Sequence, residues 1–266
     1  MHAKSRPIMT TATSTSIGLF ASVLVLVGGC ALQSQPPPAP ADLKQDYERA
    51  IRDAAIRRPD SSVALHSITA GQTMVPVATF TEWGVPATPL TRDTWVSLPE
   101  QLREMCRGKL DPVLAIEQIL GLPPMLTPSR PDHQWAVVTF VVPRMNIFRP
   151  CPGGTDIAAP RCSAGDMARN LDDATARFLL NQLWTSHRMD FEKPDNTGKM
   201  TEDFGYPFTG MGWSYDWDPA SSTPVGVSEY VVRSGAFVSN ASIASPDQFC
   251  NGANHADILK RAGREI

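Results

Sequence analysis

Hydrophobic residues recur along this chain with two different periods, and each period predicts a different kind of element. Over residues 42–58 apolar side chains recur at helical spacing, which predicts an amphipathic helix that begins at Asp42 and ends near Arg58. The same spacing predicts the longest helix over residues 173–188. Residues 134–142 instead form a nearly continuous β-prone apolar run, which is typical of a strand that is covered on both faces.

Shorter β-prone runs predict additional strands. Residues 63–68 and 75–80 flank a turn-forming segment, so we expect them to form a hairpin. A short strand is expected at 94–96. Residues 211–217 and 225–233 are expected to form two antiparallel strands joined by a proline-containing loop.

Two short helices are predicted in the middle of the chain. Ser97 and Glu100 have the spacing of a capping box, so we expect a helix that begins at Ser97 and ends at Gly108. Asp111, which stands before a proline, predicts the start of a second helix. Because no second linker is visible, we expect a single compact α+β domain over residues 42–266, with a mostly antiparallel sheet and several packed helices.

The first 30 residues have the pattern of an export signal. Lys4 and Arg6 precede an apolar run over residues 17–27, which is shorter than the ~20 residues of a membrane-spanning helix. The run closes with Gly28-Gly29-Cys30, which resembles the lipobox of bacterial lipoproteins. That resemblance implies a signal peptide over residues 1–29 and a lipidated Cys30 as the mature N-terminus.

Residues 30–41 are rich in proline and cannot form a helix or a paired strand, so they predict a tether between the lipid anchor and the domain. Ala31 follows the cysteine where an aspartate would favour the inner membrane. By resemblance to other lipoproteins, this favours the outer membrane over the inner one. We therefore expect attachment to the membrane through the lipid anchor, with the folded part in the periplasm or on the cell surface.

Four cysteines remain besides Cys30, and an exported protein meets an oxidising environment, so we expect two disulfides. Three pairings are open. The turn-rich segment between Cys151 and Cys162 favours bonding of these two, which leaves Cys106 for Cys250. A metal site or a catalytic thiol is disfavoured, because no Cys-x-x-Cys occurs and no histidine is close to either cysteine of the shorter pair.

The composition gives no sign of a nucleic-acid partner or a cofactor. The chain has 24 basic and 27 acidic residues, for a net charge of −3, and it contains no basic patch. No nucleophile elbow, phosphate loop, dinucleotide fingerprint or zinc-helix motif occurs in it. We therefore expect neither a metal nor a cofactor.

Several short blocks resemble those of a group of uncharacterised bacterial secreted proteins and lipoproteins. They are LAIEQILGLPP at 114–124, NIFRPCP at 146–152, YPFTG at 206–210 and GWSYDW at 212–217. The similarity spans roughly residues 94–232. It implies a cell-envelope setting and brings no activity, catalytic residue or cofactor with it.

Two classes of function remain open. The first is a binding or interaction module for an envelope protein or a glycan, with Trp213, Tyr215 and Trp217 as ligand contacts. The alternative is a hydrolase-like envelope enzyme that uses carboxylates. A concave site with convergent carboxylates would favour the enzyme, whereas a flat exposed aromatic patch would favour binding.

The candidate catalytic residues are Glu229, Asp216, His187 and Asp190. His187 stands near the end of the longest predicted helix, where the helix dipole explains a histidine; as a base it would work with Asp190.

Glu229 is the strongest of these candidates, because strand alternation places it on an apolar face. If Trp217 lies opposite Val225, then Trp213 lies opposite Glu229, among valines and aromatic rings. A buried carboxyl must be paired, protonated or functional. We therefore expect either a raised pKa, with a role as an acid, base or ligand contact, or an ion pair with Arg144 or Arg149.

Overall fold

The computed structural model describes residues 40–56, 63–124, 134–163, 165, 167–187, 191–194, 200–203 and 205–252. The predicted signal peptide, the lipidation site Cys30, most of the predicted tether and the candidate base Asp190 lie outside these residues.

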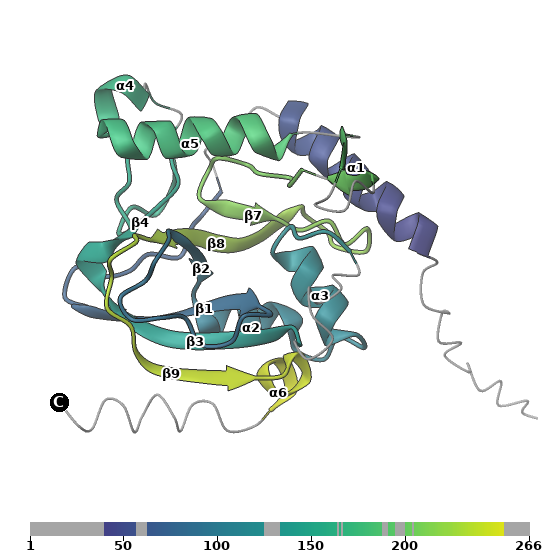
Figure 1. Ribbon diagram of the computed structural model, residues 1–266, viewed down its shortest axis with the longest axis horizontal. Coiled ribbons are helices and arrows are strands. Elements are labelled where there is room, and N and C mark those ends of the chain that lie inside the picture. Colours follow the sequence, from purple (N-terminus) through teal and green to yellow (C-terminus); the bar gives the residue numbers. More distant parts are fainter. Residues whose placement is uncertain are drawn as a thin grey trace, which may run out of the picture. The chain divides into compact units, whose positions relative to one another are not determined.

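An antiparallel sheet forms the centre of the fold, which confirms the predicted α+β class (Figure 1). Its spatial strand order is β4-β8-β2-β1-β3-β9, and β7 pairs with β8 outside this path. A separate two-stranded sheet is formed by β5 and β6. The strands are β1 (Met74–Thr81), β2 (Thr94–Ser97), β3 (Ala136–Pro143), β4 (Ile147–Phe148), β5 (Phe191–Pro194), β6 (Met200–Asp203), β7 (Trp213–Tyr215), β8 (Val225–Val232) and β9 (Ser239–Ala244).

Helices pack on this sheet in two groups. Figure 1 shows α1 and α5 on the side of β7 and β8, far from β9, whereas α2, α3 and α6 pack against one another beside β1, β3 and β8. The helices are α1 (Pro40–Ile56), α2 (Pro99–Cys106), α3 (Pro112–Ile119), the short 3₁₀ helix η1 (Arg144–Asn146), α4 (Met167–Asn170), α5 (Asp173–Ser186) and α6 (Pro246–Asn251).

Side-chain alternation along the strands gives the sheet a buried cluster on each face. Tyr230 of β8 packs with Val77 and Phe140 on one face. Val227 of β8 packs with Phe80 and with side chains of α2, α3 and α6 on the other. A third cluster lies between α1 and β7. Because successive residues of a strand point to opposite faces, Glu229 shares the face of Val227.

The two predicted disulfides are present with the predicted pairing. Cys106 of α2 is bonded to Cys250 of α6, and Cys151 is bonded to Cys162. The first bond ties together α2 and α6, two of the three helices that pack against one another on one face of the sheet. The second closes a short turn-rich loop, as the intervening prolines and glycines indicate.

Residues 63–68 do not form the first arm of a hairpin, so this prediction is wrong. Backbone N–H groups in this segment donate instead to a distant loop, from Leu65 to Pro160 O at 2.8 Å and from Ile68 to Ile157 O at 2.9 Å. The segment buries Leu65 and Ile68, but its backbone partners are far away in the sequence.

The predicted capping box at Ser97 is also wrong. Ser97 is the last residue of β2, and α2 begins after Leu98, which caps the helix without a side-chain hydrogen bond. The strand β2 instead holds the Ser97 side chain on the cavity side of the sheet, and its hydroxyl accepts no hydrogen bond from the first turn of α2.

Candidate functional site

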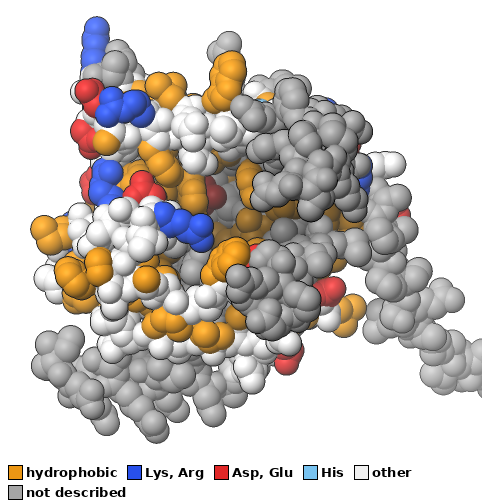
Figure 2. Space-filling model, in the orientation of Figure 1, with side chains coloured by type: hydrophobic (Ala, Val, Ile, Leu, Met, Phe, Trp, Pro, Cys, Tyr) orange, Lys and Arg blue, Asp and Glu red, His pale blue; other side chains and the backbone are white. Residues whose placement is uncertain are grey.

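A cavity of about 310 Å³ lies between the sheet and the helix α5. Its floor is formed by residues of β1, β2 and β8, and its walls by α5, by the residues after α3 and by the segment 206–208. Figure 2 shows a hollow on this face of the molecule, with hydrophobic side chains gathered around it. Its volume is within the range of about 300–1,000 Å³ that is typical of small-molecule sites.

Most of the cavity wall is apolar. Phe80, Trp95, Phe208 and Tyr215 contribute aromatic rings, and Val227 contributes an aliphatic side chain. Trp95 is held by edge-on packing against Phe208, with ring centroids 5.6 Å apart. Transfer of a small apolar molecule from water to this preformed surface would therefore be favourable.

Two of the polar side chains in this wall come from neighbouring strands and stand opposite each other. Ser97 of β2 lies directly opposite Glu229 of β8 in the antiparallel register, and both line the cavity. Ser97 is 3% exposed. Ser97 Oγ and Glu229 Oε2 are buried and have no hydrogen-bond partner among the described residues. Native proteins leave few such atoms unsatisfied, so this pair calls for an explanation.

Burial raises the pKa of Glu229 to about 8, because the charged form loses its hydration and gains no nearby cation. This agrees with the expected raised pKa. Among the described residues, neither Arg144 nor Arg149 forms an ion pair with it. Arg149 instead donates to the carbonyl oxygens of His66 and Ile157, at 2.7 and 3.1 Å.

The burial of Glu229 was predicted from a register of β7 on β8 that differs from the observed one. The strands β7 and β8 pair Tyr215 with Val225 and Trp213 with Ser228, with a register shift between the two pairs. The predicted pairing of Trp213 with Glu229 is therefore wrong. Glu229 still faces the apolar side, because the alternation along β8 itself is independent of the register with β7.

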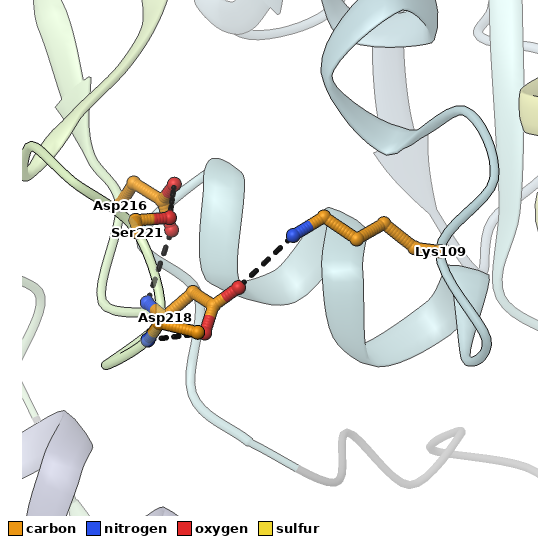
Figure 3. Close-up of polar contacts among 5 residues, drawn as sticks. Lys109, Asp216, Asp218 and Ser221 are labelled. Atoms are coloured by element: carbon orange, nitrogen blue, oxygen red, sulfur yellow. Dashed lines mark hydrogen bonds and ion pairs between the residues drawn. The ribbon is translucent and has the colours of Figure 1, made fainter. Parts of the chain in front are cut away.

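Asp216 lies in a different place and has a different set of contacts (Figure 3). Its two carboxylate oxygens accept from the backbone N–H of Asp218 at 3.0 Å and from the hydroxyl of Ser221 at 2.8 Å. Asp218 in turn forms an ion pair with Lys109 at 3.1 Å. Burial raises the pKa of Asp216, while both hydrogen bonds oppose this shift. Asp216 therefore holds the loop after β7 in shape and does not converge with Glu229.

The aromatic residues expected to contact a ligand do not form an exposed patch. Trp213 and Trp217 are 6% and 4% exposed and belong to the cluster under α1. Trp217 packs edge-on against Tyr47 of α1, with ring centroids 5.6 Å apart. Tyr215 alone of the three lines the cavity, and its hydroxyl donates to the carboxylate of Asp53.

His187 lies at the C-terminal end of α5, as expected, and its ring Nε2 donates to the carbonyl oxygen of Phe208 at 3.1 Å. This bond ties the end of the helix to the segment that forms one wall of the cavity. His187 is not one of the residues that line the cavity. A pairing with Asp190 remains a prediction, because Asp190 lies outside the described residues.

Several polar residues of the site were not predicted from the sequence, namely Thr79, Ser97, Gln182 and Ser186. The spacing of Ser97 to Glu100 indicated a helix cap, and nothing local distinguishes a serine that ends a strand from one that begins a helix. Gln182 and Ser186 are four positions apart on α5 and so share one helix face. That spacing is visible in the sequence, but the cavity it faces is not.

In the described part of the chain, no group of three or more His, Cys, Asp or Glu side chains is placed to hold a metal ion. No helix of that part is long and apolar enough to cross a membrane. Neither the protein-family models, nor the curated proteins, nor the solved structures gave a match to this chain.

Proposed function

We propose that this protein is a cell-envelope lipoprotein whose folded domain binds a small, mostly apolar molecule in the cavity between the sheet and α5. Glu229 and Ser97 would hold the polar end of that molecule, and the aromatic wall would cover its apolar body. The proposal specifies the binding module expected from the sequence, with a small molecule as the ligand.

The observation that carries the proposal is the pair of unsatisfied polar atoms in an apolar cavity. Ser97 Oγ and Glu229 Oε2 lack partners among the described residues, and both belong to side chains on the cavity wall. A ligand site typically combines an apolar lining with a few convergent polar groups, and this arrangement fits that description.

Binding is favoured over hydrolysis by the number of carboxyl groups at the cavity. Glycoside hydrolysis ordinarily requires a pair of carboxylates around the scissile bond. Glu229 is the one carboxyl among the described residues that line this cavity. Asp216 instead accepts hydrogen bonds from Asp218 and Ser221 in the loop after β7. A site with one carboxyl group and no second acid or base is better suited to binding a ligand than to hydrolysing it.

Binding in the cavity can be tested with N-phenyl-1-naphthylamine, a neutral arylamine whose fluorescence rises in apolar surroundings. The full chain carrying Cys30→Ala is used, so that attached lipid does not compete for the probe. We expect saturable binding, and we expect Gln182→Phe to weaken it by about tenfold or more, because the new ring occupies the cavity.

Leu180→Phe is the matched control, because Leu180 lies on the same helix but is 52% exposed. It should leave the affinity for the probe within about twofold of the original. The proposed function is wrong if the probe does not bind saturably, or if the two variants bind it equally well.

The envelope setting is supported by the lipobox-like junction at Cys30 and by the two disulfides, which suit an oxidising compartment. The test is Cys30→Ala in the bacterial host, followed through membrane fractionation and mass spectrometry. The original chain should be found in the membrane with a lipid-modified Cys30, and the variant should lose both properties. A variant that stays membrane-bound with an unchanged mature mass contradicts lipidation.

A further inference from the structure

The ionisable groups that face the cavity carry acidic protons only. Among the described lining residues these groups are Glu229, Tyr206 and Tyr215, and no lysine, arginine or histidine is present. The hydroxyl of Tyr215 already donates to Asp53. A fatty acid or a phosphate would therefore find no counter-charge, and its buried negative charge would lie beside a carboxyl.

The aromatic wall has the same electrostatic preference. Phe80, Trp95, Phe208 and the two tyrosines place five rings around the cavity. The face of an aromatic ring is negative, so it attracts a cation that is removed from water. Rings and a carboxyl together suit a ligand that is apolar over most of its surface and positively charged at one end.

We propose that the ligand of this cavity is a small primary amine with an aryl or alkyl body, held by an ion pair to Glu229. The ammonium group also donates to Ser97 Oγ, which lies opposite Glu229 across the strands β2 and β8. The body lies against the aromatic wall. This inference rests on the proposed function, because it assigns a ligand class to the same cavity.

Amine binding changes the protonation of the site. In the empty protein the raised pKa of Glu229, about 8, leaves most of the carboxyl groups neutral at pH 7. A primary amine arrives as an ammonium ion with its proton already attached. The carboxyl must then transfer its proton to water to form the ion pair. Binding at pH 7 therefore releases close to one proton for each amine, whereas an alcohol of the same shape releases none.

Titration calorimetry in buffers of different ionisation enthalpy counts the released protons directly. The full chain carrying Cys30→Ala is titrated at pH 7 with 2-phenylethylamine, 2-phenylethanol and 3-phenylpropionic acid. These share one aromatic body and differ in the polar end.

We expect the amine to bind about tenfold or more tightly than the alcohol, and the acid to bind most weakly. Glu229→Gln should reduce the amine affinity to that of the alcohol and abolish the proton release. Ser97→Ala should weaken amine binding several-fold while the proton release persists. Glu100→Gln, the same change at an exposed position of α2, is the matched control and should alter neither quantity.

The possible failures are distinguishable. If the alcohol binds as tightly as the amine and no proton is released, the inference is overturned while the proposed function stands. The same conclusion follows if N-phenyl-1-naphthylamine binds and the amine does not. If neither the neutral probe nor any of the three compounds binds, the proposed function fails as well. The proton count on the original protein decides the inference even if Glu229→Gln does not fold.

Discussion

Two ionisable side chains lie on opposite faces of the sheet at strand β8, and their surroundings differ greatly. Arg149 is fully enclosed, at 0% exposed, and packs over the ring of Tyr230 at 5.1 Å from its centroid. Glu229 directly precedes Tyr230 in β8 and faces the cavity on the other side of the sheet. The sheet separates the two side chains, so the guanidinium of Arg149 does not pair with the carboxyl of Glu229.

The surroundings of Arg149 are those of a structural cation. Its Nη2 donates to the carbonyl oxygens of His66 and Ile157, and the hydroxyl of Tyr230 is 3.3 Å away. These bonds hold two separate chain segments against the sheet. Burial lowers the pKa of Arg149, but a guanidinium stays charged at every pH in which a protein is folded.

A buried polar atom without a hydrogen-bond partner therefore indicates a ligand site only when there is open space beside it. Arg149 Nε and Nη1 also lack partners among the described residues, just as Glu229 Oε2 does. The difference is that the arginine is enclosed by packed chain, whereas the glutamate borders about 310 Å³ of open volume. The first arrangement indicates a cost of folding, and the second indicates a site for another molecule.

The largest effect is expected from Glu229→Gln, measured as a function of pH. The pKa of Glu229 rises from an ordinary 4.5 to about 8 on folding. A raised folded pKa means that the native protein loses stability as the pH rises through this interval. Glutamine does not titrate, so the variant should gain about 3 to 5 kcal/mol relative to the original chain between pH 4 and pH 9.

Urea unfolding at several pH values measures this gain. Glu100→Gln is again the control, and its free energy of unfolding should differ from that of the original by less than about 0.5 kcal/mol throughout. Parallel stability curves for Glu229→Gln and the original chain would show that Glu229 is hydrated or paired in the folded state, contrary to the geometry described above.

A somewhat smaller effect is expected from Arg149→Ala, and it should not depend on pH. Removal of the guanidinium orphans the carbonyl oxygens of His66 and Ile157 and leaves a void, which should cost about 3 to 4 kcal/mol. Arg161→Ala removes an exposed arginine and serves as the control. A cost that appears only at pH values where Glu229 is ionised would reveal an ion pair between the two residues, and Arg149 would then not be a purely structural cation.

The smallest effect is expected from Gly212→Ala, which adds a methyl group beside Arg149. A Cβ added at Gly212 would lie 2.9 Å from both Cγ and Cδ of Arg149. Gly235 has a similar positive φ, 85° against 72°, but no atom within 4 Å of its added Cβ. Gly235→Ala thus measures the backbone strain alone, about 1 to 2 kcal/mol. Gly212→Ala should cost about 1 kcal/mol more in urea unfolding, and equal costs would show that Arg149 moves aside freely.

Local features of the fold were predictable from the sequence where a residue type has one physical explanation. Alternation along β8 was enough to place Glu229 on an apolar face, and the turn-rich segment between Cys151 and Cys162 was enough to pair them. The start of α3 at Asp111 was predictable for the same reason, because its carboxylate accepts from the N–H groups of Val113 and Leu114.

The remaining features depend on contacts between segments far apart in the sequence. The register of β7 on β8 shifts at an irregularity between Trp213 and Tyr215, which no alternation pattern predicts. Leu65 binds a loop almost a hundred residues away rather than the next strand. The cavity itself needs α5 to lie over β2 and β8, so its lining could not be assembled from local patterns.

The bond between Cys106 and Cys250 makes most of the domain a closed covalent ring. It joins residues 144 positions apart, so α3, α5 and the strands from β3 to β9 all lie on the ring, whereas β1 and β2 precede it. A protease that cuts the backbone once anywhere on this ring leaves both fragments attached through sulfur. A chain anchored at Cys30 would therefore keep its C-terminal strands at the membrane after such a cut, and would release them only when a reductant also opens the ring.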